Sequence, residues 1–261
     1  MEHSPSWFQI LLGTGYGNLE RLVRSLPGAD RSWVKHEPVG IEHVLGSLLV
    51  LALLVVVASR VYMRARDTQA ALVPEDKLTL SNIGEIIVGY AYGAMTDIMG
   101  AKAAKKFLPL IGTCAFFILF SNLLGMIPGF TPPTDTFNTT VACAVIVFLT
   151  THAYGVKEHG LAYFKHFLGP IDQGIVGIML APLIFVVEII SHLARPFSLA
   201  VRLMANMFAD HLVLGIFMGL VPFVVPLPMM LLGLLVVVVQ TLVFCLLSTV
   251  YIAMAIEHAE H

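Results

Sequence analysis

Charged residues are scarce in this chain. Asp, Glu, Lys and Arg make up 12% of its 261 residues, while 57% of the residues are hydrophobic. A soluble domain carries about twice that charged fraction, so the composition disfavours a water-soluble protein and favours a chain embedded in lipid. The net charge of −2 gives no sign of a nucleic-acid partner. We therefore expect a polytopic membrane protein that does not bind nucleic acid.

Cysteines and catalytic motifs are also sparse. The three cysteines, Cys114, Cys143 and Cys245, each lie within an apolar run, so we interpret them as small buried residues and expect no disulfide framework and no metal site. The sequence has no phosphate-binding loop, zinc-ligand spacing or nucleophile elbow. These absences disfavour a soluble enzyme, and we expect no cofactor. The N-terminus lacks the features of a signal peptide, so we expect the first apolar run to stay in the mature protein.

Long apolar runs fill most of the remaining sequence and predict an all-α fold. A helix of about 20 apolar residues is long enough to cross a bilayer. Over about 78–106, apolar residues instead alternate with charged ones, which predicts an amphipathic helix at the membrane surface. We expect an N-terminal external arm over 1–40 and a single membrane domain over 41–261. Its five transmembrane helices are expected at about 41–59, 107–127, 138–155, 174–220 and 228–256.

The expected span over 174–220 is about twice as long as a perpendicular helix needs. It fits either two spans or one long, tilted helix bent near Pro196. We find no internal repeat, which weighs against a secondary transporter built from inverted repeats.

Lys and Arg residues are unevenly distributed between the segments that join the spans. Seven lie in 60–106 and two in 156–173, whereas the turn over 128–137 has none and the N-terminal arm has four. Positive charge favours the cytoplasmic side. We therefore expect the first two segments in the cytoplasm and the N-terminus outside.

Polar residues interrupt the apolar sequence in one stretch, EIISHLARPFSLAVRLMANMFADH, over 188–211. An ionisable residue at mid-membrane costs about 2.5 kcal/mol or more and usually marks an ion or proton pathway. At 100° per residue, Asn206 and Glu188 both fall about 40° from Arg202, and Asp210 falls about 80° from it. His211 falls on the opposite side. A continuous helix would carry one polar stripe facing another protein or a water-filled cleft.

Structural roles stay open for several of these residues. Arg195 fits a side chain that reaches the membrane surface, and Glu188 fits an ordinary interhelical pair. Asn206 and Gln240 fit interhelical hydrogen bonding. Arg202 lies deep in the apolar stretch, where a fixed positive charge needs a carboxylate or water nearby, so it is the strongest functional candidate.

The segment PFSLAVRLMANMFADHL, with Glu188 and Ser191 before it and Gln240 in the last span, resembles subunit a of F-type ATP synthases. A second segment, FSNLLGMIPGFTPPT, followed by Asp135, adds to the resemblance, which covers about 41–256.

The resemblance implies a multi-pass, proton-translocating subunit of the ATP synthase membrane sector in the cell inner membrane. Its last two helices would be long and tilted beside a ring of small hairpin subunits (the c-ring), each bearing a membrane carboxylate, which favours one helix over 174–220 and a cytoplasmic C-terminus. Peripheral-stalk b subunits are further implied partners. Two offset half-channels would couple proton flow to ATP synthesis, and the chain would not be an enzyme by itself.

Residue roles are implied by position. Arg202 matches the essential arginine, whose guanidinium stays protonated, attracts the ring carboxylate and blocks a direct leak. The cytoplasmic half-channel is matched by Glu188 and Ser191. The outer half-channel is matched by Asn206, His211, Gln240 and Asp135.

Two positions depart from the family pattern. In many relatives a carboxylate and a histidine face each other between the last two helices, but the position facing His211 is Gly233 in this chain. Asp210 stands where glycine is common, and we hypothesise that it supplies the missing carboxylate.

Two other functions compete with this interpretation. A transporter or permease would bind a charged substrate near Arg202 and work in liposomes without a partner ring. A structural membrane scaffold would use the polar stripe only for assembly, and Arg202→Ala would leave ion movement intact.

Overall fold

The computed structural model describes residues 6–25, 41–65, 80–127, 129–160, 163, 175–220 and 226–257. Within these ranges the chain is all-helical, without a strand. Its elements are α1 (Trp7–Leu12), α2 (Thr14–Arg24), α3 (Glu42–Ala65), α5 (Leu80–Gly125), η1 (Pro133–Asp135), α6 (Phe137–His159), α8 (Ile175–Leu220) and α9 (Pro226–Glu257).

Five of these helices, α3, α5, α6, α8 and α9, are long and apolar enough to cross a membrane. This confirms the expected all-α, multi-pass membrane fold. In the N-terminal arm, α1 and α2 are short helices; residues 1–5 and 26–40 of that arm lie outside the described ranges. Trp7 of α1 donates its backbone N–H to the carbonyl of Gly129 at 3.2 Å, which attaches the arm to the turn before η1.

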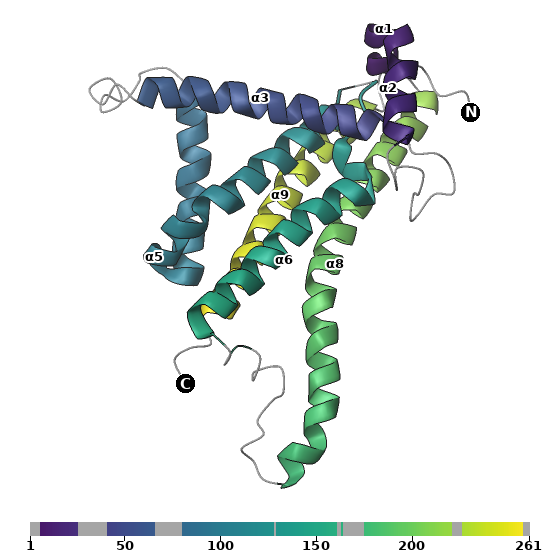
Figure 1. The fold of residues 1–261 in the computed structure, drawn as a ribbon. Coiled ribbons are helices and arrows are strands. Elements are labelled where there is room, and N and C mark those ends of the chain that lie inside the picture. The colour runs from purple at the N-terminus through teal and green to yellow at the C-terminus, as the bar shows by residue number, and fades with distance from the viewer. Residues whose placement is uncertain are drawn as a thin grey trace.

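α5 contains both the segment expected as a surface helix and the span expected after it. The two parts meet at a kink at Gly100, where φ is +76° and ψ is 158°. Only glycine adopts such backbone angles without strain. The change of direction therefore falls at Gly100, and the helix continues without a break through 106 and 107. In Figure 1 the part before the kink descends from α3 and the part after it rises beside α6 and α9.

α8 is one helix of 46 residues. Pro182 and Pro196 lie inside it without ending it, so the stretch over 175–220 forms a single long element rather than two spans. α9 begins at Pro226 and is also long, with 32 residues. A proline in the first turn of a helix loses no hydrogen bond that the helix would otherwise make.

The main core lies where α5, α6, α8 and α9 meet. Its buried side chains include Ile118 of α5, Val147 of α6, Leu203 of α8 and Phe244 of α9. In Figure 1 the arm, η1 and the end of α8 lie at one end of this bundle, and the ends of α6 and α9 lie at the other. α8 thus runs from one end of the bundle to the other along its side.

Candidate functional site

Arg202 lies near the middle of α8, on the face turned away from the core. Leu199 and Leu203, its neighbours on the inner face, are 2% and 0% exposed. Arg202 itself is exposed, and within the described parts of the chain it makes no hydrogen bond or ion pair. The sequence places this charge in an apolar stretch, and the fold turns it outward from the bundle.

Small side chains surround Arg202 on the same face of α8. They recur every three or four residues, which places them in one stripe along a helix, and all are exposed: Ala194, Ser198, Ala205 and Ala209. Beyond the stripe, larger apolar side chains such as Phe197 and Phe208 are exposed at 62% and 40%. The alanines were not predicted from the sequence, because only polar residues were considered as candidates. Their recurrence every three or four residues on the Arg202 face could have indicated them.

A hydrogen bond joins α8 to α9 one turn beyond Arg202. The Nδ2 atom of Asn206 donates to Oε1 of Gln240 at 2.6 Å. Gln240 is only 4% exposed, and its Nε2 atom is buried without a partner. The structure therefore brings these two predicted residues together at the edge of the face that carries Arg202.

A small cavity, which we call the Asp210 cavity, lies further along α8. Asp210 and His211 both line it, together with Asn122 and Gly125 of α5. His211 and Gly125 lie together in its lining. The volume of the Asp210 cavity is about 10 Å³, close to the space that one water molecule requires.

Asp210 points from α8 toward Gly233 of α9. A Cβ atom built on Gly233 would lie only 2.6 Å from Oδ2 of Asp210. The absence of a side chain at Gly233 therefore makes room for this carboxylate between the two helices. Asp210 thus lies against Gly233, the position on α9 that the sequence analysis expected to face His211.

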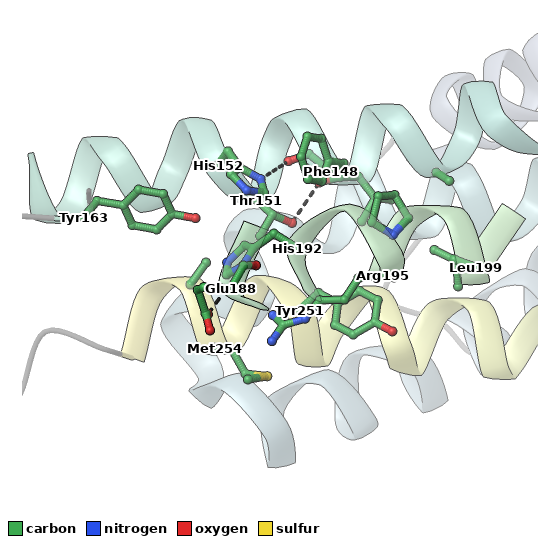
Figure 2. A pocket seen from close by; sticks show the side chains of 14 residues that line it. Phe148, Thr151, His152, Tyr163, Glu188, His192, Arg195, Leu199, Tyr251 and Met254 are labelled. Atoms are coloured by element: carbon green, nitrogen blue, oxygen red, sulfur yellow. Dashed lines mark hydrogen bonds and ion pairs between the residues drawn. The ribbon is translucent and has the colours of Figure 1, made fainter. Parts of the chain in front are cut away.

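A larger cavity, which we call the Glu188 cavity, lies in the opposite direction along α8. Its volume is about 50 Å³, and it is bounded by α6, α8 and α9 (Figure 2). Its ionisable lining groups are Glu188, His192 and Arg195 from α8, His152 from α6, Tyr251 from α9, and Tyr163. Burial raises the pKa of the Tyr163 phenol, so its hydroxyl stays protonated near neutral pH.

Two other predicted residues lie outside both cavities. Ser191 is half-buried on α8 and lines neither of them. Asp135 ends η1, which packs against α8, and it is also half-buried without lining the Asp210 cavity. The two cavities lie on opposite sides of Arg202 along α8: the Glu188 cavity extends as far as Leu199, three residues before Arg202, and the Asp210 cavity begins at Met207, five residues after it.

Comparison with known proteins identifies the family. The model of the family described as "ATP synthase A chain" matches residues 45–253. The chain belongs to this family. A protein of Sorangium cellulosum named "ATP synthase subunit a" is 46% identical over 255 residues, covering 94% of this chain and 98% of that protein.

Two further relatives carry the same name. The protein of a Geobacter species is 48% identical over 222 residues, covering 85% of this chain and 93% of its own length. The protein of Geotalea uraniireducens is 53% identical over 178 residues, covering 68% and 75%. The family and the five apolar helices together support a multi-pass membrane subunit that takes part in ATP synthesis and proton transport.

Proposed function

We propose that this chain is the subunit of a rotary ATP synthase that carries protons to and from a ring of carboxylate-bearing subunits, with Arg202 as its essential charged group. The observation that carries the proposal is the position of Arg202: it is exposed on α8, between two separate cavities that ionisable side chains line along the same helix.

The surroundings of Arg202 suit a moving partner with a carboxylate. A guanidinium keeps its proton under all working conditions, and an opposite charge close to a carboxylic acid favours loss of that acid's proton. The small side chains of Ala194, Ser198, Ala205 and Ala209 let another helix approach the backbone of α8 closely. The exposed apolar residues beyond them suit a partner embedded in the same membrane.

The two cavities suit two half-channels that do not meet. Arg202 lies between them, and its fixed positive charge opposes the passage of a proton from one directly to the other. The Asp210 cavity lies at the end of the bundle near η1, which the distribution of Lys and Arg assigns to the outside. The Glu188 cavity lies toward the end of α6, and the same rule assigns the segment over 156–173 to the cytoplasm.

Asp210 and His211 are the proton-carrying groups of the outer half-channel in this proposal, with Asn206 and Gln240 next to Arg202. Protons that enter there load the ring, travel with it and leave on the Glu188 side. The N-terminus lies outside and the C-terminus in the cytoplasm of a cell inner membrane. The ring and peripheral-stalk b subunits are the partners, and the nucleotide chemistry takes place on other subunits.

Replacing Arg202 tests this function. The assembled complex carrying Arg202→Ala, in inverted membrane vesicles, should lose ATP-driven proton pumping, because the ring carboxylate loses the charge that drives its deprotonation. Arg60→Ala serves as a matched control, since Arg60 is exposed on α3, and it should pump like the unmodified complex. Undiminished pumping by the Arg202→Ala complex would refute the proposed function.

A further inference from the structure

The Glu188 cavity contains ionisable groups from three parts of the chain. The ring centroids of His192 on α8 and His152 on α6 lie 5.5 Å apart, and in Figure 2 the His192 ring lies between His152 and the Glu188 carboxylate. The Nδ1 atom of His192 lies 3.4 Å from Oε1 of Glu188. The sequence interpretation assigned a proton-pathway role to Glu188 alone among these three residues.

Backbone contacts set which nitrogen of each ring takes up a proton. Nδ1 of His152 lies 2.9 Å from the carbonyl oxygen of Phe148, and Nδ1 of His192 lies 3.0 Å from that of Glu188. A ring nitrogen that faces a carbonyl carries a hydrogen, so in each neutral ring Nε2 is the basic nitrogen. Each neutral ring can therefore accept a proton at Nε2.

The cavity has room for water between these groups. Its volume of about 50 Å³ exceeds the 10–15 Å³ or so that one water requires, so a short chain of waters fits. Polar partners for such waters are present on three sides, from Glu188, His152 and Tyr251. The lining also includes Leu199, less than one helical turn from Arg202, so the cavity extends toward the site of proton exchange.

We propose that His152 and His192 form a proton relay between Glu188 and the cytoplasm, and that the path on this side runs through the cavity between α6 and α8. This inference rests on the proposed function. A proton held by the Glu188 carboxylic acid passes through cavity water to Nε2 of one ring. Glu188 becomes a carboxylate, the imidazole becomes an imidazolium, and the imidazolium then releases that proton to water leading out.

The relay requires only one proton on the pair at a time. Two imidazolium rings at this separation would repel each other, and Arg195 adds a third positive charge. Glu188 is the acidic side chain that lines the same cavity, and Tyr163 and Tyr251 contribute hydroxyl groups to it. A histidine pair that gains and loses one proton is suited to transfer near neutral pH.

His152→Gln separates proton transfer from structure. Glutamine can still donate a hydrogen bond to the Phe148 carbonyl, but it cannot take up a proton. We expect the rate of ATP-driven pumping by the assembled complex to fall about tenfold, less than the 10²–10⁴-fold typical of an obligatory proton-transfer group, because Glu188 and water remain. The dependence of the rate on cytoplasmic pH between pH 5 and 8 should flatten.

Chemical rescue gives the second readout. Imidazole added to vesicles carrying His152→Ala should restore pumping, because it supplies the missing base. The matched control is His159→Ala: His159 lies on the same helix but contacts the Ala255 carbonyl at 3.1 Å and does not line the cavity, so imidazole should leave its rate unchanged.

A rate and pH profile for His152→Gln equal to those of the unmodified complex would overturn the relay, as would rescue of both alanine variants alike. These results are distinct from failure of the proposed function, which is read from Arg202→Ala. If Arg202→Ala abolishes pumping while His152→Gln does not slow it, only the relay is rejected.

Discussion

Gly233→Ala offers a sharp perturbation of the α8–α9 interface. The new Cβ atom would lie 2.6 Å from Oδ2 and 3.2 Å from Cγ of Asp210. Ordinary contact begins near 3.4 Å, so the carboxylate would have to retreat by about 0.8 Å. The substitution therefore moves the Asp210 side chain without removing its carboxyl group.

The expected loss of stability in Gly233→Ala depends on which atom the new Cβ displaces. Overpacking a tight interior usually costs about 1–3 kcal/mol. The displaced atom is the end of a short side chain that can rotate, so we expect about 1 kcal/mol in the stability of the complex. If Asp210 carries protons on the outer side, a similar loss in the transfer step would slow pumping about fivefold.

A double-mutant cycle isolates the contact. Melting of the purified complex and ATP-driven pumping are measured for Gly233→Ala, Asp210→Ala and the pair. The Gly233→Ala effect should disappear in the Asp210→Ala background, leaving a coupling energy above about 0.5 kcal/mol. Gly215→Ala is the control, because its Cβ would meet nothing within 4 Å. An equal effect of Gly233→Ala in both backgrounds would refute the placement of Asp210 against Gly233.

Two further predictions concern the neighbouring contacts. Gln240→Leu removes the acceptor of the Asn206 hydrogen bond. Interhelical hydrogen bonds in membranes contribute about 0.6 kcal/mol and at most about 1.7 kcal/mol, so the melting temperature of the complex should change little while proton pumping slows. Unchanged pumping would show that Gln240 is not part of the proton path. Gly100→Ala places a side chain on a backbone with φ of +76°. It should destabilise the complex by about 1–3 kcal/mol, measured by thermal melting. An unchanged melting temperature would mean that the kink does not require glycine.

Most of the fold could be predicted from the sequence, because the length of an apolar run limits how a chain crosses a membrane. The kink in α5 could not. Charges mixed with apolar residues indicated a surface helix up to about 106, but the direction of the chain changes where Gly100 permits unusual backbone angles. Whether 174–220 formed one helix or two also required the structure, because Pro196 is compatible with both.

The sequence predicted the polar residues of α8 and Gln240 of α9, but not most of the contacts that α8 makes with other helices. Helical spacing placed Arg202, Asn206 and Glu188 near one face, and the structure shows Arg202 exposed there. The partners of this helix depend on how it packs against others, which its spacing does not determine. His152 reaches the Glu188 cavity from α6, and Asp210 meets Gly233 only because of the register between α8 and α9.

Cross-linking tests the central claim, that the Arg202 face of α8 meets a ring carboxylate. With the native cysteines replaced by serine, Ala205→Cys and Ala209→Cys lie on the exposed face, and Ala200→Cys, which is 0% exposed at the native residue, is the buried control. The account predicts disulfides from the first two, and not the third, to a cysteine placed beside the carboxylate of a ring subunit. Absence of cross-links at both exposed positions, or equal cross-linking at position 200, would contradict it.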